Sequence, residues 1–315
     1  MTTNLTTSSD GVRMIPITVP DGREFKVFTK KVAATKTETR DTDAGPIKML
    51  LLHGGPGCTY EYLESFADFL PQAGIEFYYY DQLGSYHSDQ PDDKSLWTVE
   101  RFLEEVEQVR RALGLENFYL FGNSWGALLG MEYGIKYGQY LKGLILSNMT
   151  ASVPSYLKYI NYLRNQMPPE TIAIYEKYEA LDDLEHPEYQ EALVALYNLH
   201  ICRVVPWPEP VQRMFSHLAT PVYNTMQGNN EFVVTGTFKD WDRWADLHRI
   251  GTPTLISVGA HDSMSVADIQ EMGRRIPNSR VSVCPNGSHM SFWDDQEHYF
   301  PELIQFVHDV EAKRF

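Results

Sequence analysis

Gly122-Asn123-Ser124-Trp125-Gly126 is the stretch that decides the fold of this chain. An apolar segment, 117–121, precedes it, and a segment with helical periodicity, 127–133, follows it. Strand, tight turn and helix in this order are the context of a nucleophile elbow, which holds a serine on a strained turn. The two glycines let strand and helix approach closely. Because Gly-x-Ser-x-Gly alone is a common small-residue turn, the rest of the chain decides its meaning.

The bulk composition describes an acidic globular protein. Its 315 residues suffice for one large α/β domain with an insertion, or for two domains. A hydrophobic content of 43% fills a sizeable core and excludes wholesale disorder. The formal net charge of -15 argues against nucleic acid and anionic membranes as partners. The charge suits solubility first and a cationic substrate second.

The cysteines and the N-terminus indicate a reducing compartment. Cys58, Cys202 and Cys284 are scattered, without a Cys-x-x-Cys pair, which argues against a disulfide framework or a zinc site. Residues 1–10 are polar, with no secretory signal, and we expect a loose tail there. No apolar run approaches the roughly 20 residues of a membrane span. We therefore expect a cytoplasmic protein that needs no cofactor or metal.

Strand and helix patterns alternate along most of the chain, which predicts a mostly parallel central sheet with helices on both faces. A hairpin is expected over 12–32 and a loop over 35–46. Further strands are expected at 48–52, 76–81, 117–121, 141–146, 253–259 and 280–284, with helices at 60–72, 99–113, 266–276 and 297–313. The alternation breaks between 150 and 240, where the sequence is helical, aromatic and acidic. We expect a hydrolase-type core, 1–149 and 241–315, with an inserted helical cap, 150–240.

Two later strand ends supply partners for Ser124. A serine needs an adjacent base at neutral pH, and in this architecture the order along the chain is Ser, then Asp or Glu, then His. Asp262 follows the strand at 253–259, and His289 follows the strand at 280–284. The order and the positions predict Ser124 as nucleophile, His289 as base and Asp262 as the acid that orients it.

The same chemistry needs donors for the oxyanion. One is expected to be the backbone N–H of Trp125, the residue after the nucleophile. The second is expected from the loop His53-Gly54-Gly55-Pro56-Gly57, where glycines let the backbone lie close to a reacting carbonyl.

From about residue 47 onward, the sequence resembles the proline iminopeptidase family of α/β-hydrolases, especially its tricorn-interacting aminopeptidase branch. The residues that carry the resemblance are His53-Gly54-Gly55-Pro56-Gly57, Tyr80-Asp81-Gln82, the elbow, Gly287-Ser288-His289-Met290-Ser291-Phe292-Trp293-Asp294, and, in the cap, Pro187-Glu188-Tyr189-Gln190-Glu191-Ala192, Asn230-Glu231-Phe232 and Lys239-Asp240-Trp241-Asp242. The resemblance implies the α/β-hydrolase fold and release of an N-terminal residue, often proline, from short peptides. It implies Gly55 as the second oxyanion donor and Glu231 as the partner of the substrate's free α-amino group. Tyr223, in the same cap segment, is a candidate wall of the first-residue pocket, with core packing as the alternative.

Two departures from that family bear on specificity. Where the tricorn-interacting branch has a second amine-binding glutamate, directly after the catalytic acid, this chain has Ser263. Where the family usually has Gly-Arg after Gly84, this chain has Tyr86-His87, which is expected to reshape the pocket rim. Both positions leave the strictness for proline open.

The leading hypothesis is a serine aminopeptidase acting on short peptides or aminoacyl amides. An amino-acid amidase, esterase or lactonase with the same triad is the second, and a non-catalytic ligand-binding protein on the same fold is the third. The sequence leaves the first-residue preference and homo-oligomerisation open.

Overall fold

The computed structural model describes residues 11–35 and 46–315, and within them eight strands form one sheet in the order β1-β2-β4-β3-β5-β6-β7-β8. The expected tail at 1–10 and most of the expected loop at 35–46 lie outside the described residues. The strands are β1 (Val12–Thr18), β2 (Glu24–Val32), β3 (Ile47–Leu52), β4 (Ile75–Asp81), β5 (Phe118–Asn123), β6 (Leu141–Ser147), β7 (Thr254–Gly259) and β8 (Ser279–Cys284).

The sheet is mostly parallel, as predicted. β1 pairs antiparallel with β2, β2 pairs antiparallel with β4, and every pairing from β4 across to β8 is parallel. The near-continuous apolar run of β3 has its cause here, since a parallel strand between two neighbours is covered on both faces. Parallel strands end at the same edge, so residues that follow β5, β7 and β8 are brought to one side of the molecule.

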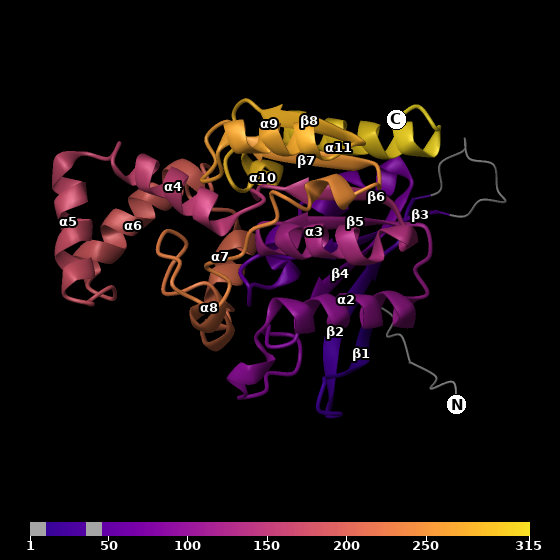
Figure 1. Cartoon of the computed structure of the whole chain (residues 1–315), viewed down its shortest axis with the longest axis horizontal. Coiled ribbons are helices and arrows are strands. Elements are labelled where there is room, and N and C mark those ends of the chain that lie inside the picture. Colours follow the sequence, from indigo (N-terminus) through magenta and orange to yellow (C-terminus); the bar gives the residue numbers. More distant parts are fainter. Residues whose placement is uncertain (1–10, 36–45) are drawn as a thin grey trace.

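Helices cover both faces of the sheet (Figure 1). The core helices are α1 (Phe66–Phe69), α2 (Val99–Leu113), α3 (Trp125–Tyr137), α9 (Val266–Arg275), α10 (Ser291–Asp294) and α11 (Gln296–Glu311). Along β6, a methyl group built on Gly130 of α3 would meet Leu146, whereas one built on Gly143 would meet Phe306 of α11. Neighbouring strand residues point to opposite faces, so α3 and α11 lie on opposite sides. The predicted α/β-hydrolase architecture is confirmed.

Between β6 and β7 the chain forms a group of helices that lies together at one end of the molecule (Figure 1). They are α4 (Val153–Arg164), α5 (Pro169–Ala180), α6 (Pro187–His200), α7 (Glu209–Ser216) and α8 (Thr220–Met226). We propose the division into a core, 1–149 and 241–315, and a cap, 150–240, on this arrangement. No helix in the described part of the chain is long and apolar enough to cross a membrane.

The segment 60–72 differs from its sequence-based prediction of a single helical stretch. It forms three short pieces: the 3-10 turn η1 (Tyr60–Leu63), α1, and the 3-10 turn η2 (Pro71–Ala73). Pro71 has no N–H and begins η2, which ends at Gly74 with a left-handed φ of 75°. In contrast, α2 begins and ends where predicted, because Thr98 caps its start and Gly114 its end.

Candidate active site

Ser124 stands at the sharp turn between β5 and α3. Its backbone has φ 55° and ψ −124°, a conformation that costs a non-glycine residue about 1–3 kcal/mol. Its N–H donates to the carbonyl of Ser147 at the end of β6 (2.9 Å), and its own carbonyl accepts from the N–H of Ala127 (2.8 Å). Hydrogen bonds on both sides of the turn thus hold the strained residue in place.

The elbow glycines are there because no side chain fits. A methyl group on Gly122 would lie 2.1 Å from the carbonyl oxygen of Gly126, and one on Gly126 would lie 2.2 Å from the carbonyl oxygen of Leu52. Both contacts are with backbone, which cannot rotate away. Any larger residue at either position would push strand and helix apart and displace Ser124.

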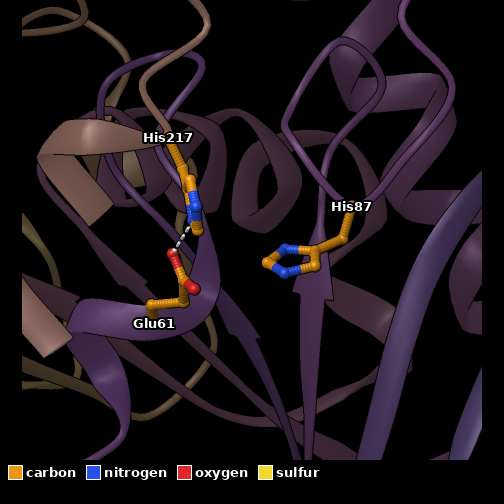
Figure 2. A group of neighbouring side chains, drawn as sticks. All are labelled: Glu61, His87 and His217. Carbon is orange, nitrogen blue, oxygen red and sulfur yellow. Dashed lines mark hydrogen bonds and ion pairs between the residues drawn. The ribbon is translucent and has the colours of Figure 1, made fainter. Parts of the chain in front are cut away.

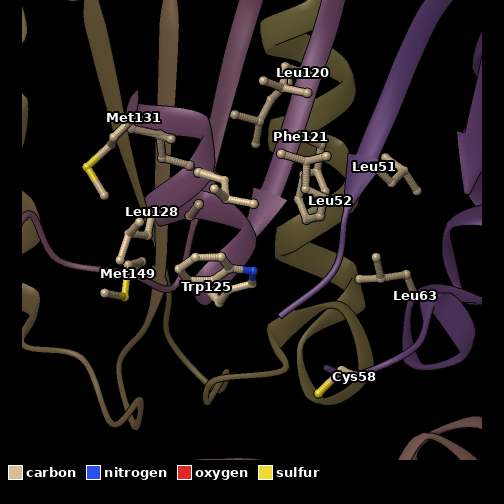
Figure 3. Close-up of a cluster of buried hydrophobic side chains, with 14 of the residues drawn as sticks. Leu51, Leu52, Cys58, Leu63, Leu120, Phe121, Trp125, Leu128, Met131 and Met149 are labelled. Atoms are coloured by element: carbon tan, nitrogen blue, oxygen red, sulfur yellow. The ribbon is translucent and has the colours of Figure 1, made fainter. Parts of the chain in front are cut away.

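The side chain of Trp125, the residue after the nucleophile, is held in one position by its neighbours. Its side chain is 2% exposed, and it lies beside Leu128 and Met149 in the core (Figure 3). Its ring stacks on Phe238 with centroids 5.5 Å apart. Its Nε1 donates to Oε1 of Gln82 at 2.8 Å. The side chain after the nucleophile is therefore held by packing and by one directed hydrogen bond.

The structure brings His289 and Asp262 together at the ends of β8 and β7. His289 Nδ1 lies 2.9 Å from Asp262 Oδ1, and both side chains are buried. The carboxylate also accepts from the N–H of Met264 (3.0 Å) and from Nδ2 of Asn148 (2.6 Å). Since these donors leave the acid no freedom to rotate, the imidazole is oriented with Nδ1 toward the carboxylate.

The surroundings of His289 favour its charged form. Burial, the largest single cause, lowers the pKa of His289, but the charge of Asp262, its hydrogen bond and the charges of Glu231 and Asp294 together raise that pKa above its usual value. An imidazolium formed during proton transfer is thereby stabilised.

The backbone N–H groups of Gly55 and Trp125 are candidate donors for an oxyanion. The N–H of Gly54 is occupied, donating to the hydroxyl of Tyr62 at 2.7 Å. The N–H groups of Gly55 and Trp125 donate to no residue that the structure describes. Gly55 has φ 107°, and a methyl group there would lie 2.7 Å from the N–H nitrogen of Cys58. Because the N–H of Gly54 is already bonded, the N–H of Gly55, the predicted residue, is the better candidate for the second oxyanion donor.

A cavity of about 240 Å³ opens above Ser124. Ser124, His289, Gly55, Glu231 and Tyr223 all line it, so the predicted site residues from core and cap face one space. The cap adds the apolar or aromatic side chains of Leu193, Tyr197, Ile201, Met214, Phe215 and Leu218, together with the polar Glu185, Gln190, Asn229 and Asn230.

A much smaller niche, about 10 Å³, also borders Ser124. Ser124, Gly55 and Glu231 line it as well, so the two spaces share these three residues. Its remaining walls are Trp125, Leu128, Met149, Val153, Tyr156, Gln227, Phe238 and Met264. As it stands the niche would hold about one water molecule.

Glu231 is held by tyrosines from three cap helices. The hydroxyl of Tyr156 in α4 lies within hydrogen-bond distance of Oε1 (2.9 Å) and of the backbone carbonyl oxygen of Glu231, and Tyr223 of α8 donates to Oε2 (3.4 Å). The N–H of Glu231 donates to the hydroxyl of Tyr197 in α6 (3.2 Å). Burial raises the pKa of Glu231, although His289 and the two hydroxyls act in the opposite direction. Tyr223 lines the larger cavity rather than the niche.

The two departures from the family pattern lie outside both spaces. Ser263 is fully buried, with Oγ 3.3 Å from Asp262 Oδ1 and from His289 Nδ1, so it faces the acid–base pair. Tyr86 and His87 line neither space at Ser124. Tyr86 lines another cavity of about 330 Å³ between the core loop and the segment after α7.

Three supporting residues have roles that sequence reasoning did not find. Asn148 directly follows β6, so the strand-end rule that selected Asp262 would have marked it. Gln82 belongs to the motif Tyr80-Asp81-Gln82, and its N–H donates to Nε2 of the buried His53 (3.0 Å). Tyr156 lies in a helix of ordinary amphipathic character, and nothing in the sequence marked its contact with Glu231.

The fold and this arrangement of side chains define the class of α/β-hydrolases. Residues 48–296 match the family model described as alpha/beta hydrolase fold. A proline iminopeptidase from Elizabethkingia meningoseptica is 46% identical over 307 residues, covering 96% of this chain and 100% of the relative. Among solved structures, a proline iminopeptidase from Mycobacterium smegmatis is similar with a TM-score of 0.85 and 30% identity, covering 95% of this chain and 100% of the other. The structure of VinJ is similar with a TM-score of 0.85 and 32% identity, covering 94% and 98%.

The chain belongs to the proline iminopeptidase family of α/β-hydrolases. It is accordingly a serine hydrolase of the aminopeptidase type, as the sequence predicted.

Proposed function

We propose that the chain releases one N-terminal residue, proline or another small apolar residue, from short peptides or aminoacyl amides. The observation that carries this proposal is the position of Glu231, which lines both spaces that meet at Ser124. A carboxylate there pairs with the ammonium of a substrate whose first carbonyl lies at the serine. The pairing sets the cleavage register to one residue.

In this proposal Ser124 attacks the scissile carbonyl while His289 accepts its proton. Asp262 orients the imidazole and stabilises its charged form. The N–H groups of Gly55 and Trp125 donate to the oxyanion. His289 then protonates the leaving amine, and a water molecule activated by the same imidazole hydrolyses the acyl-enzyme.

The two spaces suit the two parts of such a substrate. The niche is small and mostly apolar apart from Ser124, Tyr156, Gln227 and Glu231, and it must widen to seat even a compact first side chain such as that of proline or alanine. The larger cavity receives the leaving peptide, and its limited volume favours short peptides. Glu185, a second cap carboxylate, also lines the larger cavity and adds negative charge to it.

The direct test compares the wild-type protein with Ser124→Ala on proline and alanine arylamides. Loss of the nucleophile is expected to lower kcat by about 10⁴–10⁶-fold. A fluorophosphonate should label the wild-type protein and leave the folded variant unlabelled. Substantial residual hydrolysis by Ser124→Ala would contradict the assignment.

An amino-acid amidase, an esterase or a lactonase would use the same triad, and the comparisons do not favour them. The requirement for a free amine separates these activities, because only the aminopeptidase and amino-acid amidase need Glu231. A cytoplasmic location stays a prediction, supported by three cysteines that are buried and unpaired.

A further inference from the structure

A second group of chemistry-bearing side chains lies at the seam between core and cap. Glu61 comes from η1, His87 from the loop after β4, and His217 directly follows α7. One carboxylate oxygen or imidazole nitrogen of each lies within 4.8 Å of the corresponding atoms of the other two. Figure 2 shows Glu61 and His217 hydrogen-bonded, with Nδ1 and Oε2 2.8 Å apart, and the ring of His87 directed toward this pair.

We propose that Glu61, His87 and His217 form a binding site for one divalent transition metal ion, with Zn²⁺ the best match. Two imidazoles and one carboxylate are a common protein ligand set for Zn²⁺ and leave the fourth position to water. The same ligands accept Co²⁺ and Ni²⁺. The hydrolytic mechanism at Ser124 does not use this ion, so the site is separate from the proposed function.

A buried carboxylate, that of Asp81, orients the ring of His87. Oδ2 of the fully buried Asp81 lies 2.7 Å from His87 Nδ1. The other oxygen of Asp81 accepts from the N–H of Tyr60 at 2.6 Å, so this carboxylate is fixed. A carboxylate bound to one ring nitrogen keeps the proton there and leaves the lone pair of the other nitrogen free for a metal. His87 therefore presents Nε2 as the ligand atom.

The other two ligands, Glu61 and His217, are also held in place by their neighbours. Oε2 of Glu61 accepts from the hydroxyl of Thr59 at 2.7 Å, and the Glu61 side chain is only 3% exposed. The ring of His217 stacks on Tyr86, with centroids 3.8 Å apart and an interplanar angle of 7°. Both ligands are thus positioned before an ion arrives.

The charges near the three ligands favour a cation. Among the residues that the structure describes, the carboxylate of Asp81 contacts His87, and those of Glu61, Glu64 and Glu209 all pair with one guanidinium, that of Arg213. Arg213 lies 3.2 Å from Glu61, 2.7 Å from Glu64 and 3.3 Å from Glu209. With both imidazoles neutral, the negative charge exceeds the positive charge, which attracts a cation.

Binding needs only a small rearrangement. Ligand atoms of a tetrahedral Zn²⁺ site lie about 3.4 Å apart, given metal–nitrogen bonds of about 2.0–2.1 Å. The most widely spaced ligand atoms, up to 4.8 Å apart, must therefore approach by about 1.4 Å, whereas Glu61 Oε2 and His217 Nδ1, now 2.8 Å apart, must separate by roughly 0.5 Å as the ion replaces their hydrogen bond. The side chains of His87 and His217 are 26% and 23% exposed, so an ion reaches them from solvent.

The site would tie the cap to the core at the wall of the substrate cavity. Phe215 and Leu218, on either side of His217, both line that cavity. This gives the Tyr86-His87 departure a role, since Tyr86 packs on one ligand and His87 is another. Bound metal is therefore expected to raise the unfolding temperature and to change KM more than kcat.

The test is a titration of metal-free protein, without a polyhistidine tag, with Zn²⁺ by calorimetry and with Co²⁺ by visible absorption. We expect one ion per chain with a Kd of about 10 µM or tighter, and intense Co²⁺ bands of a tetrahedral site. His87→Ala, His217→Ala and Glu61→Gln should each weaken binding at least about 10-fold. His298→Ala is the matched control, because His298 also pairs with a carboxylate, Asp295 at 2.6 Å, but lies at α11.

Absence of saturable binding up to about 1 mM of either ion, a concentration at which even weak sites fill, would overturn the proposal. Wild-type affinity in either histidine variant would overturn it too. Circular dichroism checks that each variant is folded, and His87→Gln, which keeps a donor for Asp81, replaces His87→Ala if the latter unfolds. The readout is metal binding, so failure here is distinct from failure of the proposed aminopeptidase activity.

Discussion

The two sides of the substrate cavity are built by different means. On the core side, Ser124, Asp262 and His289 follow parallel strands, and backbone geometry fixes where they lie. On the cap side, Glu231 lies in a loop after α8, and tyrosine hydroxyls hold it in place. The elbow on the core side tolerates no added side chain, since methyl groups at Gly122 and Gly126 would meet backbone. The cap side depends on side chains that substitution can alter one at a time, which suits the part that selects the substrate.

Among substitutions that keep the nucleophile, the largest effect is expected on the core side, for Asp262→Asn. The amide keeps the shape of the carboxylate but favours the wrong tautomer of His289, so kcat should fall by about 10⁴-fold. Arylamide kinetics measure the loss. Asp268→Asn, in the adjacent helix α9, is the matched control and should keep wild-type activity. Equal losses in both variants would contradict the role of Asp262.

A somewhat smaller loss is expected for Gly55→Ala. The added methyl group would lie 2.7 Å from the backbone nitrogen of Cys58 and must displace an oxyanion donor, so kcat should fall by about 10²–10³-fold. Gly22→Ala is the control for backbone strain alone, since Gly22 has φ 89° with nothing within 4 Å of the added carbon. If Gly55→Ala keeps full kcat, its N–H is not an oxyanion donor.

On the cap side, Tyr156→Phe removes one hydroxyl from Glu231 and keeps the ring. We expect KM for substrates with a free amine to rise about 10-fold, the worth of one hydrogen bond to a charged group. kcat for an ester without an amine should stay unchanged. Tyr159→Phe, in the same helix, controls for loss of a hydroxyl from α4. Equal effects on amine and ester substrates would mean that Tyr156 does not act through Glu231.

The smallest effect is electrostatic coupling between the two sides. His289 acts as a base only when neutral, and its raised pKa means that activity is lost as pH falls through a value above about 6.5. Burial lowers this pKa, and the charges of Asp262 and Glu231 raise it. Glu231→Gln should therefore move the acidic limb of kcat/KM to lower pH. An unmoved limb would show that the two sides are not coupled.

The sequence predicted the core side far better than the cap side, for a physical reason. Strand ends, glycines that exclude side chains and the chain order of the triad all leave local signals, so α2, β5 and the pairing of Asp262 with His289 followed from them. The prediction of a single helical stretch at 60–72 was wrong, because the chain forms three short pieces there and Pro71, which has no N–H, begins the last of them. The contact of Tyr156 with Glu231 joins residues 75 positions apart, and no local pattern encodes such a distance. Assignment of Glu231 came from family resemblance alone.

In the proposed mechanism, Ser124 of the core attacks substrates that Glu231 of the cap selects by their free amine. The most direct measurement is kcat/KM for a proline arylamide and its N-acetylated counterpart, in the wild-type protein and in Glu231→Gln. We expect a wild-type preference for the free amine of about 100-fold, the worth of one desolvated charge pair. In the variant that preference should collapse through loss on the free-amine substrate, with fluorophosphonate labelling of Ser124 unchanged. A preference that survives in Glu231→Gln would contradict the account.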